Sequence, residues 1–473
     1  MSNNSPDTGS PVSFLLSLLV FLLLAGLAPP AGPLSAQEAP DAPAAELGAD
    51  DSPDLLPLPG ASAGGDKADP DAPYAPPEGE SFVEFCGNSA PGEIKRAVEA
   101  GADVNFQTES NFTPLLAAAG FNPDKAAVEV LLEAGADLNH VERRFGLNAL
   151  MVAASYNRDP AMIELLVDKG LDVNAVNFQG GTALIQAASS NPAPEVAEAL
   201  VKAGADIDAA DSMGATALMH ASGYGSVRVI RKLVALKADV ALTDRLGDTA
   251  LAWAARTNPD SGAVAELLKA GADPAARNLR QYTPMYYSAT NPNYDVFAFM
   301  LQTGAGRDNL VTPEGTALML AAATNPNLSV ARKLLAMGFD PSERNQDGIT
   351  VLMFAVNNEE PAMTKLILAQ RADPNVPDPG GRTALMYAAN FSKNPVTVRL
   401  LLGAGADTDL VDNGGKTAAD YARENTVKSV AALFENFKKS DGAAPAAPGD
   451  SDAAAPGAPP AGSDADAGGT AQN

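Results

Sequence analysis

The chain has 473 residues, of which 58 are acidic and 32 are basic, and it carries a formal net charge of −26 with a single cysteine, Cys86. A protein this acidic, with no stripe of lysine and arginine, repels phosphate backbones, which argues against a nucleic acid as its partner. One cysteine excludes a disulfide within the chain.

An apolar run from residue 12 to residue 28 is followed by two prolines and then by the small-residue stretch Leu34–Gln37. This order is typical of a secretory signal peptide, so we expect residues 1–36 to be removed and the rest to be periplasmic or secreted. No lysine or arginine precedes the run, however, and its 17 residues are at the lower limit for spanning a bilayer. The alternative is an uncleaved segment that anchors the chain to the inner membrane by residues 12–28, and only then do we expect membrane contact.

Two further segments are rich in proline, alanine, glycine and aspartate, namely residues 37–80 and 440–473. Residues 1–80 contain 12 acidic residues and one basic residue, and residues 440–473 contain five acidic residues and no basic one. Neither segment has enough large apolar side chains to offset the entropy that is lost on ordering. The sequence therefore predicts a disordered linker at 37–80 and a disordered acidic tail at 440–473.

Between these segments one unit of sequence recurs with a spacing of 33, 34 or 35 residues. Ten units begin at Thr113, Asn148, Thr182, Thr216, Thr249, Thr283, Thr316, Thr350, Thr383 and Thr417. A second marker, Gly-Ala-Asp, keeps the same period at Gly101, Gly135, Gly204, Gly271 and Gly405. A fixed period of this length indicates stacked repeats and not a series of separate globular domains.

Each unit predicts two helices and a turn. The leading threonine can cap a short first helix, and a paired apolar step such as Leu267–Leu268 ends the second helix on one face. The glycine that follows suits a helix end in the left-handed region, so Lys237 and Arg371, which replace it in two units, should each cost about 1 kcal/mol. Aspartate or asparagine five residues before the threonine, with glycine two before it, predicts a tight turn.

Two further signals concern the ends of helices. Asn-Pro pairs such as Asn258–Pro259 lie between the two helices of several units, where proline stops the first helix. Ser81 and Glu84 have the spacing of a capping box, which predicts the start of a partial N-terminal unit.

This pattern resembles the ankyrin repeat family, whose unit of about 33 residues is a projecting turn and two antiparallel helices. The family's Thr-Pro-Leu-His motif survives in part as Thr113-Pro114-Leu115 and Thr283-Pro284, with methionine in place of histidine in several units. The resemblance spans residues 81–439 as a partial repeat and ten full repeats. It implies an all-α solenoid that binds another protein or a peptide on its concave groove.

The sequence offers little for catalysis or metal binding. Its two histidines, His140 and His220, lie two units apart, and no phosphate-binding loop, nucleophile elbow or zinc-binding helix motif is present. We therefore expect no enzyme activity, no cofactor and no metal site.

Aromatic residues and arginines recur near the expected groove. The candidate binding residues are Arg245, Trp253, Arg256, Arg280, Tyr286, Tyr287, Phe354 and Tyr387. Tyrosine, tryptophan and arginine dominate binding hot spots, which favours recognition. Aromatic side chains at this position also pack between adjacent helices, and that interpretation is favoured over recognition.

These patterns together predict a monomeric, non-catalytic scaffold of the cell envelope that binds a partner protein or peptide. A structural alternative stays open, in which the disordered arms tether envelope components to one another.

Overall fold

The computed structural model describes residues 76–304 and 306–439, in which the chain forms eleven pairs of short helices. The first helices of the pairs are α2 Glu80–Asn88, α4 Pro114–Phe121, α6 Ala149–Tyr156, α8 Ala183–Ser190, α10 Ala217–Tyr224, α12 Ala250–Thr257, α14 Pro284–Ser288, α16 Ala317–Thr324, α18 Val351–Ala355, α20 Ala384–Phe391 and α22 Ala418–Glu424. The second helices are α3 Pro91–Glu99, α5 Ala126–Glu133, α7 Pro160–Asp168, α9 Pro194–Lys202, α11 Val227–Ala235, α13 Ser261–Lys269, α15 Tyr294–Gln302, α17 Leu328–Ala336, α19 Pro361–Ala369, α21 Pro395–Gly403 and α23 Lys428–Lys439. The all-α solenoid expected from the repeat is confirmed. The predicted signal peptide, the linker up to residue 75 and the tail from residue 440 lie outside the described residues.

The first residue of each predicted unit is the N-cap of a first helix. Thr182, for example, has extended backbone angles, and its side chain accepts a hydrogen bond from the backbone N–H of Ile185. The first residue of every other unit makes the same bond except Thr383, whose buried hydroxyl does not cap its helix. A side chain that satisfies one of the free N–H groups at a helix start fixes where that helix begins.

The capping box predicted at Ser81 and Glu84 is wrong. Helix α2 begins at Glu80 after Gly79, which has a φ of 59°, and no side chain caps it. Ser81 lies within the helix. A capping box does form at the other end of the array, where Thr417 and Asp420 bond each other's backbone N–H groups.

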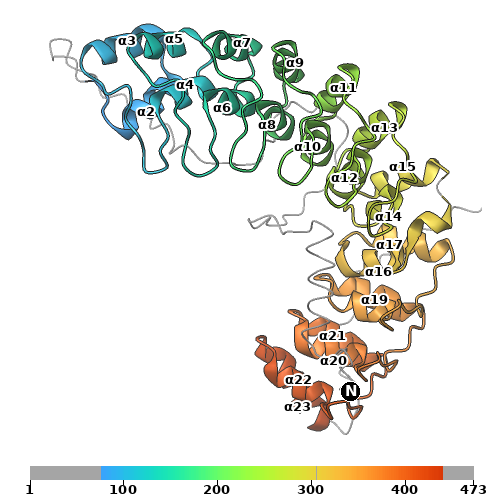
Figure 1. The fold of residues 1–473 in the computed structure, drawn as a ribbon. Helices are drawn as coiled ribbons and strands as arrows, with labels where there is room; N and C mark the ends of the chain where they lie inside the picture. The colour runs from blue at the N-terminus through green and yellow to red at the C-terminus, as the bar shows by residue number, and fades with distance from the viewer. Residues whose placement is uncertain (1–75, 305, 440–473) are drawn as a thin grey trace, which may run out of the picture.

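The helix pairs stack into a curved array. Along helices α2 to α13, the first helices and the loops between units line the inner side of the curve, and the second helices line the outer side (Figure 1). We call these two sides the inner and the outer face. Each loop that joins the second helix of one unit to the first helix of the next is called a finger.

Second helices end in the left-handed region, as predicted. Gly135, Gly204 and Gly271 have φ angles of 90°, 97° and 94°. Lys237 and Arg371 occupy the same place with φ angles of 77° and 64°, although a side chain with a Cβ atom is disfavoured there.

Replacing either Lys237 or Arg371 by glycine is therefore expected to raise the free energy of unfolding by about 1 kcal/mol, because the Cβ strain is removed. Chemical denaturation of each variant measures the gain. The reverse change, Gly135→Lys, is the matched control and should lower stability by a similar amount. Equal stability of all the variants would contradict this assignment of strain.

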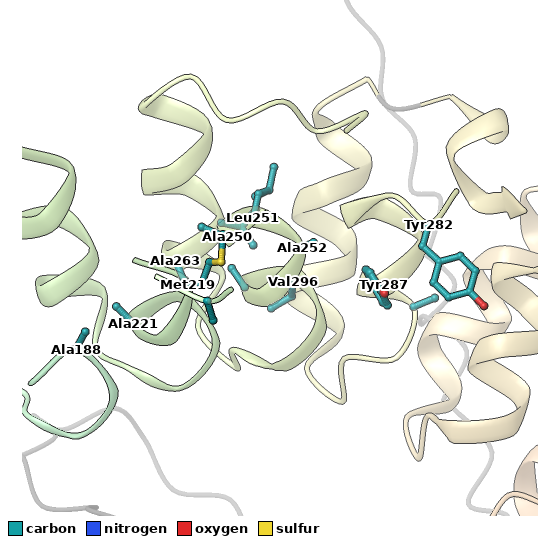
Figure 2. Close-up of a cluster of buried hydrophobic side chains, with 14 of the residues drawn as sticks. Ala188, Met219, Ala221, Ala250, Leu251, Ala252, Ala263, Tyr282, Tyr287 and Val296 are labelled. Carbon is teal, nitrogen blue, oxygen red and sulfur yellow. The ribbon is translucent and has the colours of Figure 1, made fainter. Parts of the chain in front are cut away.

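A single apolar core runs through the described units. The leucines that precede the terminal glycine, Leu131, Leu166, Leu200, Leu267, Leu334 and Leu401, are fully buried. Figure 2 shows part of the core, which continues without a gap from Ala188 through Leu251 to Tyr287. In such an array each unit is stabilised mainly by its two neighbours.

A row of asparagines, which are buried except for the half-buried Asn425, crosses the stack where the first helices end. In each case the side-chain amide donates to two backbone carbonyls of the preceding unit; for Asn325 these are Ala289 and Asn291, each at 2.8 Å. The Oδ1 atom of Asn325 accepts from the N–H of Asn327 at 2.8 Å, and Asn327 in turn caps the second helix by accepting from the N–H of Ser329. The members of this asparagine ladder are Asn122, Asn157, Asn191, Asn258, Asn291, Asn325, Asn358 and Asn425. The Asn-Pro signal in the sequence thus marks an inter-unit contact as well as a helix end.

The ladder is interrupted at two units, where Gly225 and Ser392 take the place of asparagine. At Gly225 a Cβ atom would lie 2.6 Å from the carbonyl oxygen of Ala188, so no other residue fits this tighter connection.

The unit that begins at Thr283 departs most from the pattern of the other units. Helix α14 has only five residues, and the finger after α15 contains a 3₁₀ turn at Arg307–Leu310. A two-stranded hairpin follows, in which β1 Val311–Thr312 pairs antiparallel with β2 Gly315–Thr316.

Candidate protein-binding surface

Seven of the fingers turn at the predicted aspartate or asparagine, namely at Asn177, Asp211, Asp244, Asn278, Asn345, Asp378 and Asp412. In the finger before α8, the Oδ1 atom of Asn177 accepts from the N–H groups of Gln179 and Gly181 at 3.0 and 2.8 Å. Asp211 makes the equivalent bonds to Met213 and Ala215 at 2.8 and 2.9 Å. These side chains mimic a backbone turn and hold the two arms of the finger together.

Backbone hydrogen bonds join neighbouring fingers into one rigid edge. Phe178 N–H donates to Phe145 C=O at 3.0 Å, and Ser212 N–H donates to Gln179 C=O at 2.9 Å. The series continues with Arg245 to Met213 and Leu279 to Leu246, both at 3.0 Å. This close approach requires glycine at the turns: a Cβ on Gly180, whose φ is 76°, would lie 2.9 Å from the nitrogen of Ser212.

In several units the fourth residue of the first helix bonds the finger before it. His220 contacts Asp211 at 2.9 Å, and the indole N–H of Trp253 donates to Asp244 at 3.0 Å. Tyr387 donates to Asp378 at 2.5 Å in the same geometry. The recurrence of polar aromatic side chains at this position therefore has a structural cause, since each bonds the carboxylate nine residues earlier.

These contacts also shift the ionisation of the turn residues. Burial alone would raise the pKa of Asp211, but hydrogen bonds from His220 and from the N–H groups of Ala215 and Met213 outweigh it and lower the pKa. Burial and the bond to Asp378 raise the pKa of Tyr387. The carboxylates of Asp211 and Asp378 thus accept hydrogen bonds from donors of the same chain.

Five of the eight candidate binding residues are buried. Tyr286, Tyr287, Phe354, Tyr387 and Arg256 expose only 0%, 1%, 5%, 3% and 6% of their surface. A partner on the surface cannot contact these side chains in this fold, so their expected place in an exposed patch is corrected. Among the alternatives weighed from the sequence, packing describes their placement.

Three candidates do reach the surface. Arg245 is exposed at a finger turn, and Trp253 is half-buried on the inner face. Arg280 is partly exposed and lies 3.6 Å from the carboxylate of Glu314 in the next finger.

Arg256 and Tyr287 meet in a buried polar network around Asp248. The carboxylate of Asp248 lies 3.3 Å from Arg256, accepts from Tyr287 at 3.1 Å and accepts from Asn278 at 2.7 Å. Burial raises the pKa of Asp248 above its ordinary value, although Arg256 opposes the shift. This arrangement joins three successive segments of the array inside the core.

Exposed apolar side chains show which face is available to a partner. Among the described residues the large apolar side chains that are exposed are Val141, Phe145, Val176, Phe178, Met213, Tyr224, Leu279, Val311 and Val411. All lie in fingers except Tyr224, which ends helix α10, and none lies in a second helix. Exposed apolar surface that is confined to one face marks an interaction site.

We call the outward residues of five successive fingers the fingertip row. They are Arg143, Arg144, Phe145, Phe178, Gln179, Ser212, Met213, Arg245, Leu246, Leu279 and Arg280. The acidic residues at these turns, Glu142, Asp211 and Asp244, are instead bonded to backbone N–H groups of their own fingers. The fingertip row is therefore apolar and basic in an otherwise acidic protein.

Sequence reasoning missed the apolar members of this row. The available signal was a large apolar residue one or two positions after the turn residue, as at Phe178 and Met213, where a solvent-exposed turn ordinarily has a polar side chain.

A second exposed feature lies on the inner face. The ring of Tyr224, which is 63% exposed, meets the ring of Trp253 edge-on at 6.1 Å. The ring of His220 lies 5.5 Å from that of Trp253. Edge-on and tilted ring pairs at such distances are favourable and keep the cluster in one conformation.

The described residues contain no cluster of three or more histidine, cysteine or acidic side chains that could hold a metal ion. Within the same part of the chain, none of the helices has the length and apolar character needed to cross a membrane.

Comparison with known proteins identifies the repeat. The family model described as ankyrin repeats, three copies, matches in overlapping windows that run from residue 85 to residue 443. A comparison with curated protein sequences gives no match. Because the family matches cover well over half of the sequence and agree with the observed helix pairs, the chain belongs to the ankyrin repeat family.

Proposed function

We propose that this protein is a non-catalytic scaffold of the cell envelope that binds a partner protein through its inner face. Ankyrin repeats are protein-interaction modules, and the curvature of a repeat array provides an extended surface for a partner. The fingertip row and the Tyr224–Trp253 cluster are the contact surfaces.

The observation that carries this proposal is the one-sided exposure of apolar side chains. Phe178, Met213 and Leu279 are 69%, 58% and 78% exposed on successive or nearby fingers, and the second helices expose no large apolar side chain among the described residues. Hydrogen bonds between the fingers hold these side chains in place before a partner arrives. Preorganisation of this kind lowers the entropy that binding costs.

The envelope location is supported by the sequence of the N-terminus. Residues 12–28 are almost purely apolar and are followed by a small-residue stretch that ends at Gln37. Either cleavage after Ala36 or retention of the apolar run as an anchor places the repeats outside the cytoplasm.

Affinity capture from an envelope fraction with the full chain tests the proposal. The wild type is compared with the triple variant Phe178→Ser, Met213→Ser and Leu279→Ser, and with an outer-face control that combines Lys95→Ser, Glu164→Ser and Lys333→Ser. The same protein should be captured by the wild type and the control and be lost from the fingertip variant. Capture that is equal for all three chains would refute the inner-face assignment.

A further inference from the structure

The fingertip row has a composition that specifies the chemistry of its partner. Arg143 and Arg144 directly precede the exposed Phe145 in one finger, and Arg144 lies 4.9 Å from the centre of its ring. Phe178 and Met213 follow on the next two fingers. A ligand that matches this surface needs carboxylates beside apolar side chains, in an extended form that can follow the fingers.

One segment of this chain has that composition. Residues 50–58 read Asp-Asp-Ser-Pro-Asp-Leu-Leu-Pro-Leu, with three carboxylates and no basic residue. Leu55, Leu56 and Leu58 form the densest cluster of large apolar residues in the predicted linker, and the acidic tail at 440–473 has no leucine, isoleucine, valine or aromatic residue at all. Prolines at 53 and 57 favour an extended backbone, which reduces the entropy lost when the segment binds.

The segment can also reach the surface. Helix-to-helix spacing of about 8–10 Å puts the finger before α8 roughly 24–30 Å from α2, which is three helices away. The 17 residues between Leu58 and the first described residue, Pro76, let these two positions lie up to about 60 Å apart when extended. The finger before α14 lies about 48–60 Å from α2 by the same spacing, so the first fingers of the row are the ones within easy reach.

We propose that residues 50–58 dock in cis on the fingertip row at Phe145, Phe178 and Met213. The aspartates pair with Arg143 and Arg144, and the leucines cover the apolar side chains. The segment thereby competes with the partner for the surface described under Proposed function, on which this inference rests. The protein is then autoinhibited by its own linker, and a partner must carry a similar acidic and apolar stretch.

Disulfide trapping in the full chain tests the docking directly. Pro59→Cys is combined with Ser212→Cys, which is exposed beside Met213, because Leu58 at the end of the docked segment covers Met213. Cys86 stays in place, because it is buried and burial raises the pKa of its thiol to about 12. One control pairs Pro59→Cys with Glu164→Cys on the outer face, and another pairs Ser212→Cys with Ser451→Cys in the leucine-free tail.

Under mild oxidation the Pro59/Ser212 pair should form an intramolecular disulfide at least about tenfold faster than either control, because docking raises the local concentration of one thiol at the other. Adding Leu55→Ser, Leu56→Ser and Leu58→Ser should reduce the rate to that of the controls. Arg143→Glu with Arg144→Glu should also reduce the rate of disulfide formation to that of the controls. Adding Asp50→Lys and Asp51→Lys to this arginine variant should restore the fast rate, because the charges are then exchanged. Equal rates for all three pairs would overturn the proposal, and a dimer whose yield rises with protein concentration would overturn the cis assignment.

The same variants separate this inference from the proposed function. If both hold, the three Leu→Ser changes should increase the affinity for a captured partner by about threefold or more, since a competing segment is removed. Fast trapping without any loss of capture in the fingertip variant would refute the proposed function alone. Trapping rates equal to those of the control pairs, together with the expected loss of capture in the fingertip variant, would refute the docking alone.

Discussion

Asn325→Ala is expected to lower the free energy of unfolding by about 2–6 kcal/mol, because two buried carbonyls lose their only side-chain donor and each costs about 1–3 kcal/mol when left unpaired. The carbonyls belong to Ala289 and Asn291, one unit earlier in the array. The change also removes the side-chain oxygen that accepts a hydrogen bond from the N–H of Asn327. Asn325 is fully buried, so water cannot easily replace these bonds.

The loss should be local as well as large. Since each unit is stabilised mainly by its neighbours, hydrogen exchange should accelerate first in the units that begin at Thr283 and Thr316. Asn139→Ala is the matched control, because Asn139 is exposed at a finger and bonds Asp137 through its backbone N–H, which the change keeps. A denaturation midpoint for Asn325→Ala that equals that of Asn139→Ala would show that the asparagine ladder contributes nothing.

Arg256→Met should be the other strongly destabilising change. It leaves the carboxylate of Asp248 buried without its cation, and breaking one side of a buried ion pair costs about 3–5 kcal/mol. As an exposed binding residue of the groove, Arg256 would leave the melting temperature almost unchanged when it is replaced. The structure overturns that expectation, because Arg256 is buried and packs its guanidinium 5.2 Å from the centre of the Tyr287 ring.

The destabilisation by Arg256→Met should also depend on pH in a defined direction. Burial already raises the pKa of Asp248, and removing Arg256 raises it further, so the folded variant favours the protonated acid. An acid with a raised folded pKa destabilises the fold above that pKa and no longer does so below its unfolded value of about 3.9. The deficit relative to the wild type should therefore be largest near neutral pH and shrink as the pH falls toward 4.

Thermal denaturation across this pH range measures both effects. The double variant Asp248→Asn with Arg256→Met should recover most of the stability, because no charge is then left alone in the core. Arg245→Met provides the control, since an exposed arginine should change stability by no more than about 0.5 kcal/mol. A constant deficit at every pH would contradict the assignment to the buried carboxylate.

The sequence predicted the array itself because the repeat multiplies every weak signal. A threonine cap, a terminal glycine or a buried leucine is ambiguous alone, but ten copies in one register specify the helices and the turns together. The repeat also predicted the backbone strain at Lys237 and Arg371, since these residues occupy a position where the other units have glycine. The capping box at Ser81 failed because it stands at the edge of the array, where no second copy tests the register.

The candidate site was predicted less well, because the burial of its side chains depends on contacts with the neighbouring unit. Whether Tyr287 faces a partner or the core depends on the neighbouring unit, in which Asp248 supplies an acceptor 39 positions earlier in the chain. The asparagine ladder could not be predicted for the same reason, because the backbone carbonyls that its amides bond lie 33 to 38 positions away in the chain. The exposed Phe178 and Leu279 had no counterpart in any repeat signal, since fingertip residues are free to differ between units.

The most direct test of inner-face binding is the affinity of a captured partner for the fingertip variant, measured together with its melting temperature. Replacing Phe178, Met213 and Leu279 by serine should weaken binding by about 30-fold or more, which corresponds to the roughly 2 kcal/mol that hot-spot residues contribute. The melting temperature should stay close to that of the wild type, because these three side chains are exposed. Wild-type affinity in a fully folded fingertip variant would contradict the account.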